Sequence, residues 1–122
     1  MNTCAPDTGE SAASHQVSLE LRRAQRAFAA LIDAHRRVGE FRAAQLRSAA
    51  RRTLSALSAD DRAELADWLA LQLAASARDA GEGTLDLLAR ADERIGARVR
   101  RTLPARVEAL AIHGRPNHIF AA

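Results

Sequence analysis

Apolar residues recur at intervals of three and four along most of this chain, the spacing of one face of an α-helix. After Ser18, a good N-cap residue, one stripe predicts a first helix, and it contains Leu21, Ala24, Phe28, Leu31, Ile32 and His35. Val38, Gly39 and Glu40 interrupt the pattern, which then returns in phase at Leu46, Ala50, Leu54 and Leu57. We favour two nearly coaxial helices over one long kinked helix, because a straight helix of about 39 residues would span roughly 58 Å.

The stretch from Ser58 to Leu73 is apolar on nearly every side once it passes Trp68. Ser58 can accept a hydrogen bond from the backbone N–H three residues later, as in a capping box. The acidic residues of the first turns suit the positive end of the helix dipole. A helix that is apolar all round is buried, so we expect a central helix around residues 58–79 that ends before Gly81, with Trp68 in the core.

A third amphipathic pattern begins after Thr84, which can cap its helix. Asp92 projects on its apolar face and is expected to meet an arginine or a hydroxyl there. Pro104 should stop this helix or open a short final one that ends at Gly114. The apolar face contains Leu85, Leu88, Ile95, Val99 and Thr102, and another face carries Arg90, Arg94, Arg98 and Arg101.

These patterns predict an all-α fold, a compact bundle of four to five helices in one domain over residues 18–122. Residues 1–17 have turn formers and no periodicity, which predicts a loosely packed or disordered tail. Ile119 and Phe120 are expected to fold back onto the bundle. No apolar run of 18 residues occurs and the N-terminal segment is not a secretory signal, which favours a cytoplasmic protein with no membrane partner.

Charge is distributed in blocks along the chain. The 18 basic residues are all arginine, so every cation is a fork that can grip a phosphate or carboxylate in bidentate fashion. Residues 19–57 hold nine arginines against three acids, and residues 94–122 hold six against one. Between them, residues 58–93 hold three arginines against nine acids. The central helix is therefore acidic and its neighbours are basic.

The residues needed for catalysis or metal binding are sparse and badly spaced. Cys4 and His15 lie in the predicted tail, without the rigid geometry that a nucleophile pair needs. His113 and His118 flank a glycine and a proline, and no pair of histidines falls on one helical face. No glycine-rich phosphate loop occurs. We therefore expect no enzyme, no cofactor, no metal and no small-molecule substrate.

The arginine clusters favour binding to the phosphate backbone of RNA or DNA without sequence specificity. Aromatic residues make up only 3% of the chain, which argues against reading single bases. The block pattern of charge also allows copies to stack head to tail, acidic face against basic face, in an open array. The predicted phosphate contacts are Arg47, Arg51, Arg52, Arg90, Arg94, Arg98 and Arg101.

The alternative is a protein-interaction module whose acidic helix face docks on a basic partner. This face contains Asp60, Asp61, Glu64 and Asp67. The stretch from Leu57 to Leu69, L-S-A-D-D-R-A-E-L-A-D-W-L, resembles a helix start found in small bacterial regulatory and antitoxin proteins. A module that acts through this acidic face would be an antitoxin, a phage-type inhibitor or an adaptor.

The overall architecture, a basic helical bundle of this length, is similar to the small helical subunits of CRISPR-Cas effector ribonucleoproteins. That likeness implies a non-catalytic role, in which the protein lines a complex and contacts guide or target backbone beside other protein subunits. It carries no residue motif, so it assigns no site residue.

Overall fold

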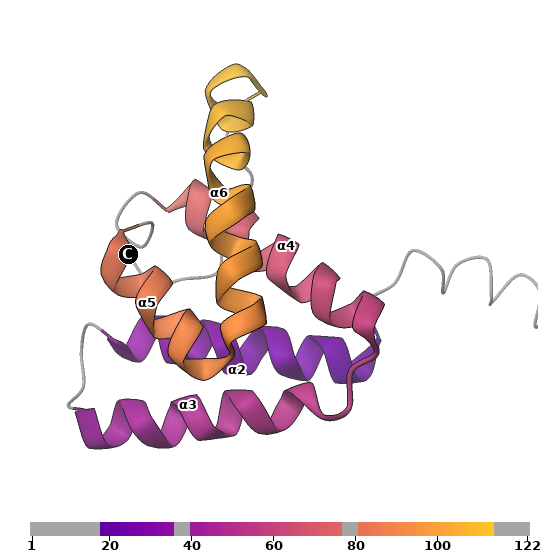
Figure 1. The fold of residues 1–122 in the computed structure, drawn as a ribbon, viewed down its shortest axis with the longest axis vertical. Coiled ribbons are helices and arrows are strands. Elements are labelled where there is room, and N and C mark those ends of the chain that lie inside the picture. Colours follow the sequence, from indigo (N-terminus) through magenta and orange to yellow (C-terminus); the bar gives the residue numbers. More distant parts are fainter. Residues whose placement is uncertain (1–17, 36–39, 77–80, 114–122) are drawn as a thin grey trace, which may run out of the picture.

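The computed structural model describes residues 18–35, 40–76 and 81–113, and every regular element in these ranges is an α-helix. The helices form an all-α bundle (Figure 1), which confirms the predicted fold class. The predicted tail at residues 1–17 and the predicted positions of Ile119 and Phe120 lie outside the described residues. The elements are α2 (Leu19–His35), α3 (Glu40–Leu54), α4 (Ala59–Ala75), α5 (Glu82–Ala91) and α6 (Glu93–His113).

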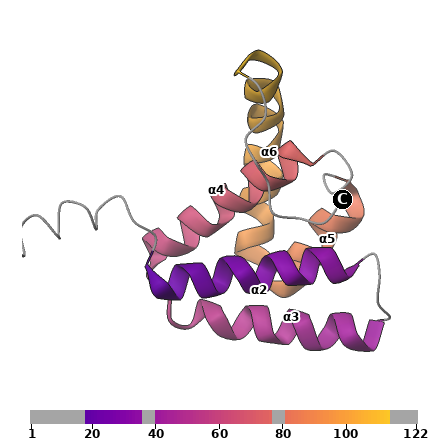
Figure 2. The ribbon, with the colours of Figure 1, turned by 180° about the vertical axis from the view of Figure 1, so that it is seen from behind.

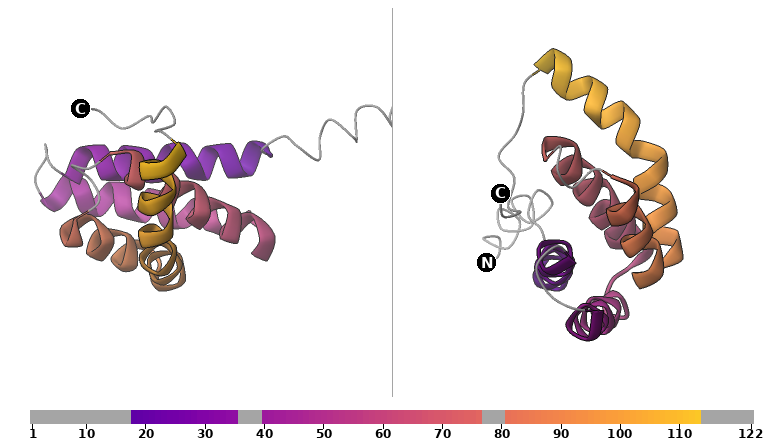
Figure 3. Two further views of the ribbon diagram at one scale, coloured as in Figure 1. Left: turned by 90° about the horizontal axis from the view of Figure 1, so that it is seen from above. Right: turned by 90° about the vertical axis from the view of Figure 1, so that its left-hand side faces the viewer.

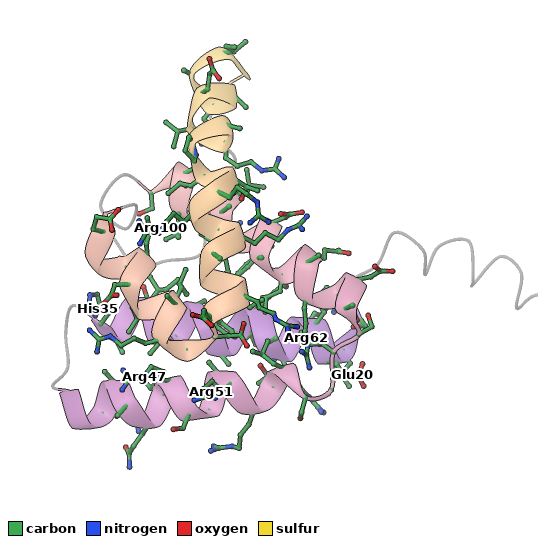
Figure 4. All side chains as sticks on the ribbon, in the orientation of Figure 1. Glu20, His35, Arg47, Arg51, Arg62 and Arg100 are labelled. Carbon is green, nitrogen blue, oxygen red and sulfur yellow. The ribbon has the colours of Figure 1, made fainter. Side chains whose placement is uncertain are left out.

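Helices α2 and α3 lie side by side and run in opposite directions (Figures 1 and 2). Two separate helices are therefore confirmed, but the nearly coaxial arrangement is wrong. Each helix of an antiparallel pair buries one apolar stripe, as each of two coaxial helices would, so helical periodicity does not distinguish the two arrangements. Phe28 of α2 and Ala50 of α3 are both fully buried. His35, predicted on the apolar stripe, is exposed at the end of α2, beside Gly83 of α5 (Figure 4).

Helix α4 lies between α2 and α6 (Figure 3) and contacts both, which confirms a central buried helix. Leu65, Leu69 and Leu73 are fully buried. The polar side chain of Gln72 is buried as well, with only 6% of its surface exposed. Trp68 is half-buried and packs against the core from its edge. Burial on several sides is what the nearly continuous apolar surface of this segment requires.

The end of α4 comes earlier than the sequence predicts. Ser76 is its C-cap, and the Ser76 N–H donates to the Leu73 carbonyl at 3.0 Å. The predicted extension to residue 79 falls partly on residues 77–80, which lie outside the described ranges. The contribution of α4 to the core is unaffected, because the buried leucines of this helix all precede Ser76.

A corner at Asp92 separates α5 from α6, where the sequence predicted one continuous helix. The Asp92 N–H donates to the Leu88 carbonyl at 2.9 Å and closes α5, while its Oδ1 accepts from the Ile95 N–H at 2.9 Å and opens α6. Asp92 thus caps a helix instead of meeting an arginine or a hydroxyl on the apolar face. The N-cap of α5 is Gly81, not Thr84, which is buried within the helix.

Helices α5 and α6 approach each other closely just after this corner. A Cβ built on Gly96 of α6 would lie 2.5 Å from the Cα of Ala89 in α5 and 2.7 Å from its backbone nitrogen. Both distances are far below van der Waals contact, so only glycine fits at this crossing. The crossing fixes how the first turns of α6 sit against α5.

Pro104 lies inside α6 and does not end it, contrary to the sequence prediction of a stop followed by a short final helix. Proline removes one backbone hydrogen bond, but the next residues, A-R-V-E-A-L-A, are mostly strong helix formers. Past the buried Leu103, the helix projects beyond the rest of the bundle (Figure 1). Val107 and Ile112 on this projecting half are 47% and 71% exposed.

The predicted caps of α2 and α4 are both present and are connected to each other. The Ser58 hydroxyl accepts from the Asp61 N–H at 3.1 Å, and the Ser18 hydroxyl accepts from the Leu21 N–H at 3.1 Å. Ser18 Oγ also lies 3.5 Å from the Asp61 carboxylate. The first turns of the two helices therefore lie together at one end of the bundle.

Replacing Ser58 by alanine should lower the free energy of unfolding by about 1 kcal/mol, because the Asp61 N–H loses its acceptor. Chemical denaturation followed by circular dichroism measures the loss. Ser55→Ala is the matched control, since its exposed hydroxyl donates to the Arg52 carbonyl outside any N-terminal cap. It should change stability by less than about 0.5 kcal/mol. Equal losses in the two variants would contradict a capping role for Ser58.

Candidate functional site

A cavity of about 510 Å³ lies between the first turns of α4 and the first half of α6. Four arginines line it: Arg62 from α4, and Arg94, Arg98 and Arg101 from α6. Positions 94, 98 and 101 are spaced by four and three residues, so they share one helical face. The apolar part of the lining, which we call the floor, consists of Leu57, Ala59, Ala63, Ala66 and Ile95.

A second cavity of about 460 Å³ adjoins the first, and the two share Arg62, Asp92 and Arg94 as lining residues. It adds Arg51 of α3 and Arg90 of α5. We call the two cavities together the arginine groove. Its six cations come from four helices and are Arg51, Arg62, Arg90, Arg94, Arg98 and Arg101.

Arg62 is the residue of this groove that sequence reasoning missed. It lies in the acidic segment of the chain, between Asp61 and Glu64, so no clustering of arginines marks it. Its Nε and Nη2 donate to the Leu54 carbonyl at 3.2 and 2.8 Å, which anchors the guanidinium between α3 and α4 (Figure 4). A side chain held in this way faces both cavities with little rotamer entropy left to lose.

Arg98 is anchored by a carboxylate. Its Nε and Nη2 donate to Oδ1 and Oδ2 of Asp67 in α4 at 3.0 and 3.2 Å, a bidentate pair. The hydrogen bonds that Arg98 donates to Asp67, and then the negative charge of Asp67, raise the pKa of Arg98 above the ordinary arginine value. The pKa of Arg100 is raised in the same way by Glu82, which accepts from Arg100 Nη1 at 2.7 Å. Arg100 lines neither cavity of the groove.

The predicted stripe of Arg90, Arg94, Arg98 and Arg101 is divided by the corner at Asp92. Arg90 belongs to α5 and forms an exposed ion pair with Asp86 at 3.1 Å. The other three stay together on α6. Because α5 packs against α6, Arg90 nevertheless lines the second cavity. All four residues of the stripe therefore lie in the arginine groove.

The predicted cluster on α3 is divided as well. Arg51 is exposed and reaches the groove, whereas Arg52 lines a separate cavity of about 310 Å³ together with Glu20 and Arg23. Arg47 is half-buried and lines none of these three cavities (Figure 4). Arg51 and Arg52 face different surroundings because consecutive positions on a helix point in different directions. Arg47 lies one turn before Arg51 on the same side of α3 but is more buried.

The acidic residues of the alternative interface are also divided. Asp67 is bound to Arg98, and Asp61 receives the bond from Ser18. Asp60 and Glu64 are exposed. Two of the four carboxylates thus interact within the molecule, and the other two remain on the surface for which a basic partner was predicted.

Among the residues that the structure describes, no group of three or more histidine, cysteine or acidic side chains is placed to hold a metal ion. Within the same ranges, no helix has the length and hydrophobicity needed to cross a membrane. In comparisons with models of protein families, with curated proteins and with solved structures, nothing matched this chain.

Proposed function

We propose that this protein is a non-catalytic helical subunit of a nucleoprotein assembly. In this proposal the arginine groove binds the phosphate backbone of RNA or DNA without sequence specificity. The observation that carries the proposal is the convergence of arginines from four helices on two adjoining cavities. Because these residues come from separate parts of the sequence, their convergence is a property of the fold and not of one basic helix face.

The charge balance of the groove supports an anionic ligand. Six arginines and two carboxylates, Asp92 and Glu93, line the two cavities. Asp67 and Asp86 pair with Arg98 and Arg90. The arginines of the groove still outnumber the carboxylates when Asp67 and Asp86 are added to Asp92 and Glu93, so the net charge of the groove is positive. One oxygen of Asp92 accepts a hydrogen bond from the backbone of α6.

Arginine suits phosphate recognition because its planar guanidinium donates two parallel hydrogen bonds to one phosphate. Arg94 and Arg101 are exposed, and the described residues provide neither of them with an ion-pair partner. Arg62 uses Nε and Nη2 to donate hydrogen bonds to the Leu54 carbonyl. Its full positive charge and its Nη1 group remain for a phosphate. These residues, with Arg51, are the cations we assign to phosphates.

The projecting half of α6 is the surface we assign to neighbouring protein subunits of the assembly. Val107 and Ile112 expose apolar side chains there, and exposed apolar residues are common where protein chains pack together. Light scattering of the protein alone and with an oligonucleotide would measure the assembly. Copies that stay monomeric in both samples would remove self-association from the proposal and leave only unlike subunits.

Affinity for an oligonucleotide of mixed sequence should fall steeply with salt. About four phosphate contacts predict a slope near −3 for log K against log salt concentration, or a loss of about 50-fold between 50 and 200 mM salt. Fluorescence anisotropy with labelled RNA and DNA measures this slope. A second oligonucleotide of unrelated sequence should bind within about threefold of the first, since phosphates carry no sequence information.

Two results would overturn the proposal. The first is no binding of either nucleic acid at 50 mM salt. The second is binding that does not change with salt, because counterion release is unavoidable when phosphates are neutralised.

A further inference from the structure

We infer that the larger cavity of the arginine groove receives an unstacked base of a single-stranded nucleic acid, while Arg94 and Arg101 hold the flanking phosphates. This inference rests on the proposed function and specifies its ligand. It concerns the shape and the floor of the cavity, which contacts with phosphates alone do not explain.

The larger cavity differs from a simple phosphate site in its volume and in its apolar lining. Its volume of about 510 Å³ lies within the range of pockets that enclose whole small molecules. A phosphate prefers to be surrounded by N–H donors, yet five apolar side chains form this floor. Ala66 and Ile95 are buried, and Ala63 is half-buried. A lining that combines apolar side chains with arginines fits a ligand with a flat apolar part and an anionic part, which describes a nucleotide.

Two anchored guanidinium groups line this cavity. Arg62 is held by the Leu54 carbonyl and Arg98 by the Asp67 carboxylate, each through Nε and Nη2. Because Asp67 neutralises Arg98, this side chain contributes its flat surface more than its charge. Guanidinium planes stack on bases of any identity, so the cavity can hold a base although the chain has few aromatic residues and reads no sequence.

The shape of the cavity selects single strands over duplexes. In a duplex the bases are stacked and paired inside the helix, and turning one outward costs a few kcal/mol. A single strand can place a base in the cavity without that cost. A duplex would contact the exposed arginines through its phosphates, and it would lose the contribution of the floor.

The experiment compares three ligands of equal length at one salt concentration by fluorescence anisotropy: a single strand, the same strand with abasic sites throughout its centre, and the corresponding duplex. RNA and DNA versions are run in parallel to distinguish these two sources of the same chemistry. The intact strand should bind about 5- to 10-fold more tightly than the abasic strand, the lower end of the range for stacking of a base. It should also bind more tightly than the duplex.

Filling the cavity should remove this preference. Ala63→Leu places a larger apolar side chain on the floor without changing any charge, and the ratio of affinities for intact and abasic strands should fall to about 1. Ala30→Leu on the exposed surface of α2 is the matched control and should keep the ratio of the natural protein. Ala59→Leu, at the exposed start of α4 and also on the floor, replaces Ala63→Leu if that variant does not fold.

The outcomes separate the inference from the function on which it rests. Equal affinity of the natural protein for intact and abasic strands, or for single strand and duplex, overturns the inference and leaves backbone binding intact. A ratio that survives in both floor variants also overturns it, because the base must then lie elsewhere. Absence of binding to all three ligands overturns the proposed function itself.

Discussion

Gly96→Ala should destabilise this protein by about 1–3 kcal/mol, the usual cost of forcing an extra methyl group into a packed interface. The added Cβ would lie 2.5 Å from the Cα of Ala89 and 2.7 Å from its nitrogen, so α5 and α6 must move apart. Helix propensity alone would predict the opposite sign, a gain of up to about 1 kcal/mol. Chemical denaturation followed by circular dichroism measures the change in the free energy of unfolding.

Gly83→Ala provides the matched control for this prediction. Gly83 is an exposed residue in the first turn of α5, and the nearest atom to an added Cβ, Nε2 of His35, is an ordinary 3.6 Å away. This variant should be neutral or more stable than the natural protein. A second test adds Ala89→Gly to Gly96→Ala, which should not restore stability because the two shortest contacts are to the backbone of residue 89. Restoration by that change, or a stable Gly96→Ala, would contradict the close crossing.

Local chemistry explains the parts of the fold that the sequence predicts well. Ser18 and Ser58 cap their helices through hydrogen bonds to residues three positions later, so the signal and its partner lie in the same short segment. The buried positions of α2 and α4 follow helical spacing for the same reason. Such features depend on only a few consecutive residues.

The features that the sequence did not predict depend on contacts between distant segments. Asp92 could be the polar residue of an apolar face or the cap of a new helix, and only the packing of α5 against α6 decides between them. Pro104 is the exception, because α6 continues through it on the strong helix formers that follow, which are local. The antiparallel arrangement of α2 and α3 is invisible to periodicity, because phase carries no direction.

The candidate site was partly predictable for a similar reason. A stripe of arginines at helical spacing identified Arg94, Arg98 and Arg101, which α6 keeps on one face. Arg62 has acidic neighbours in the sequence and joins the groove only because the Leu54 carbonyl anchors it there. Charge blocks along the sequence therefore identify the helices that can contribute arginines to a site. Tertiary contacts determine which of those arginines line the groove. The Arg98–Asp67 pair also unites one residue from each of the two predicted interfaces.

Reversing the charge of Arg94 and Arg101 together, as Arg94→Glu with Arg101→Glu, should weaken binding of single-stranded nucleic acid by about 100-fold or more at 50 mM salt. Two phosphate contacts disappear and two like charges face the backbone instead, at a salt concentration where screening is weak. Both residues are exposed and outside the ion pairs that the structure shows, so the bundle should fold normally. The slope of log K against log salt concentration should also become less negative, because fewer phosphates are neutralised.

Two further charge changes show whether the position of the arginines matters or only the net charge. Arg22→Glu with Arg26→Glu makes the same change in charge on exposed positions of α2 that line neither cavity of the groove, and it should cost about tenfold or less. Asp60→Arg with Glu64→Arg reverses the exposed part of the acidic face, and it should preserve or strengthen binding of nucleic acid. Equal losses in the two arginine variants would assign binding to net charge and remove the groove from the mechanism. A basic protein partner that is lost only when Asp60 and Glu64 are reversed would favour the interaction module instead.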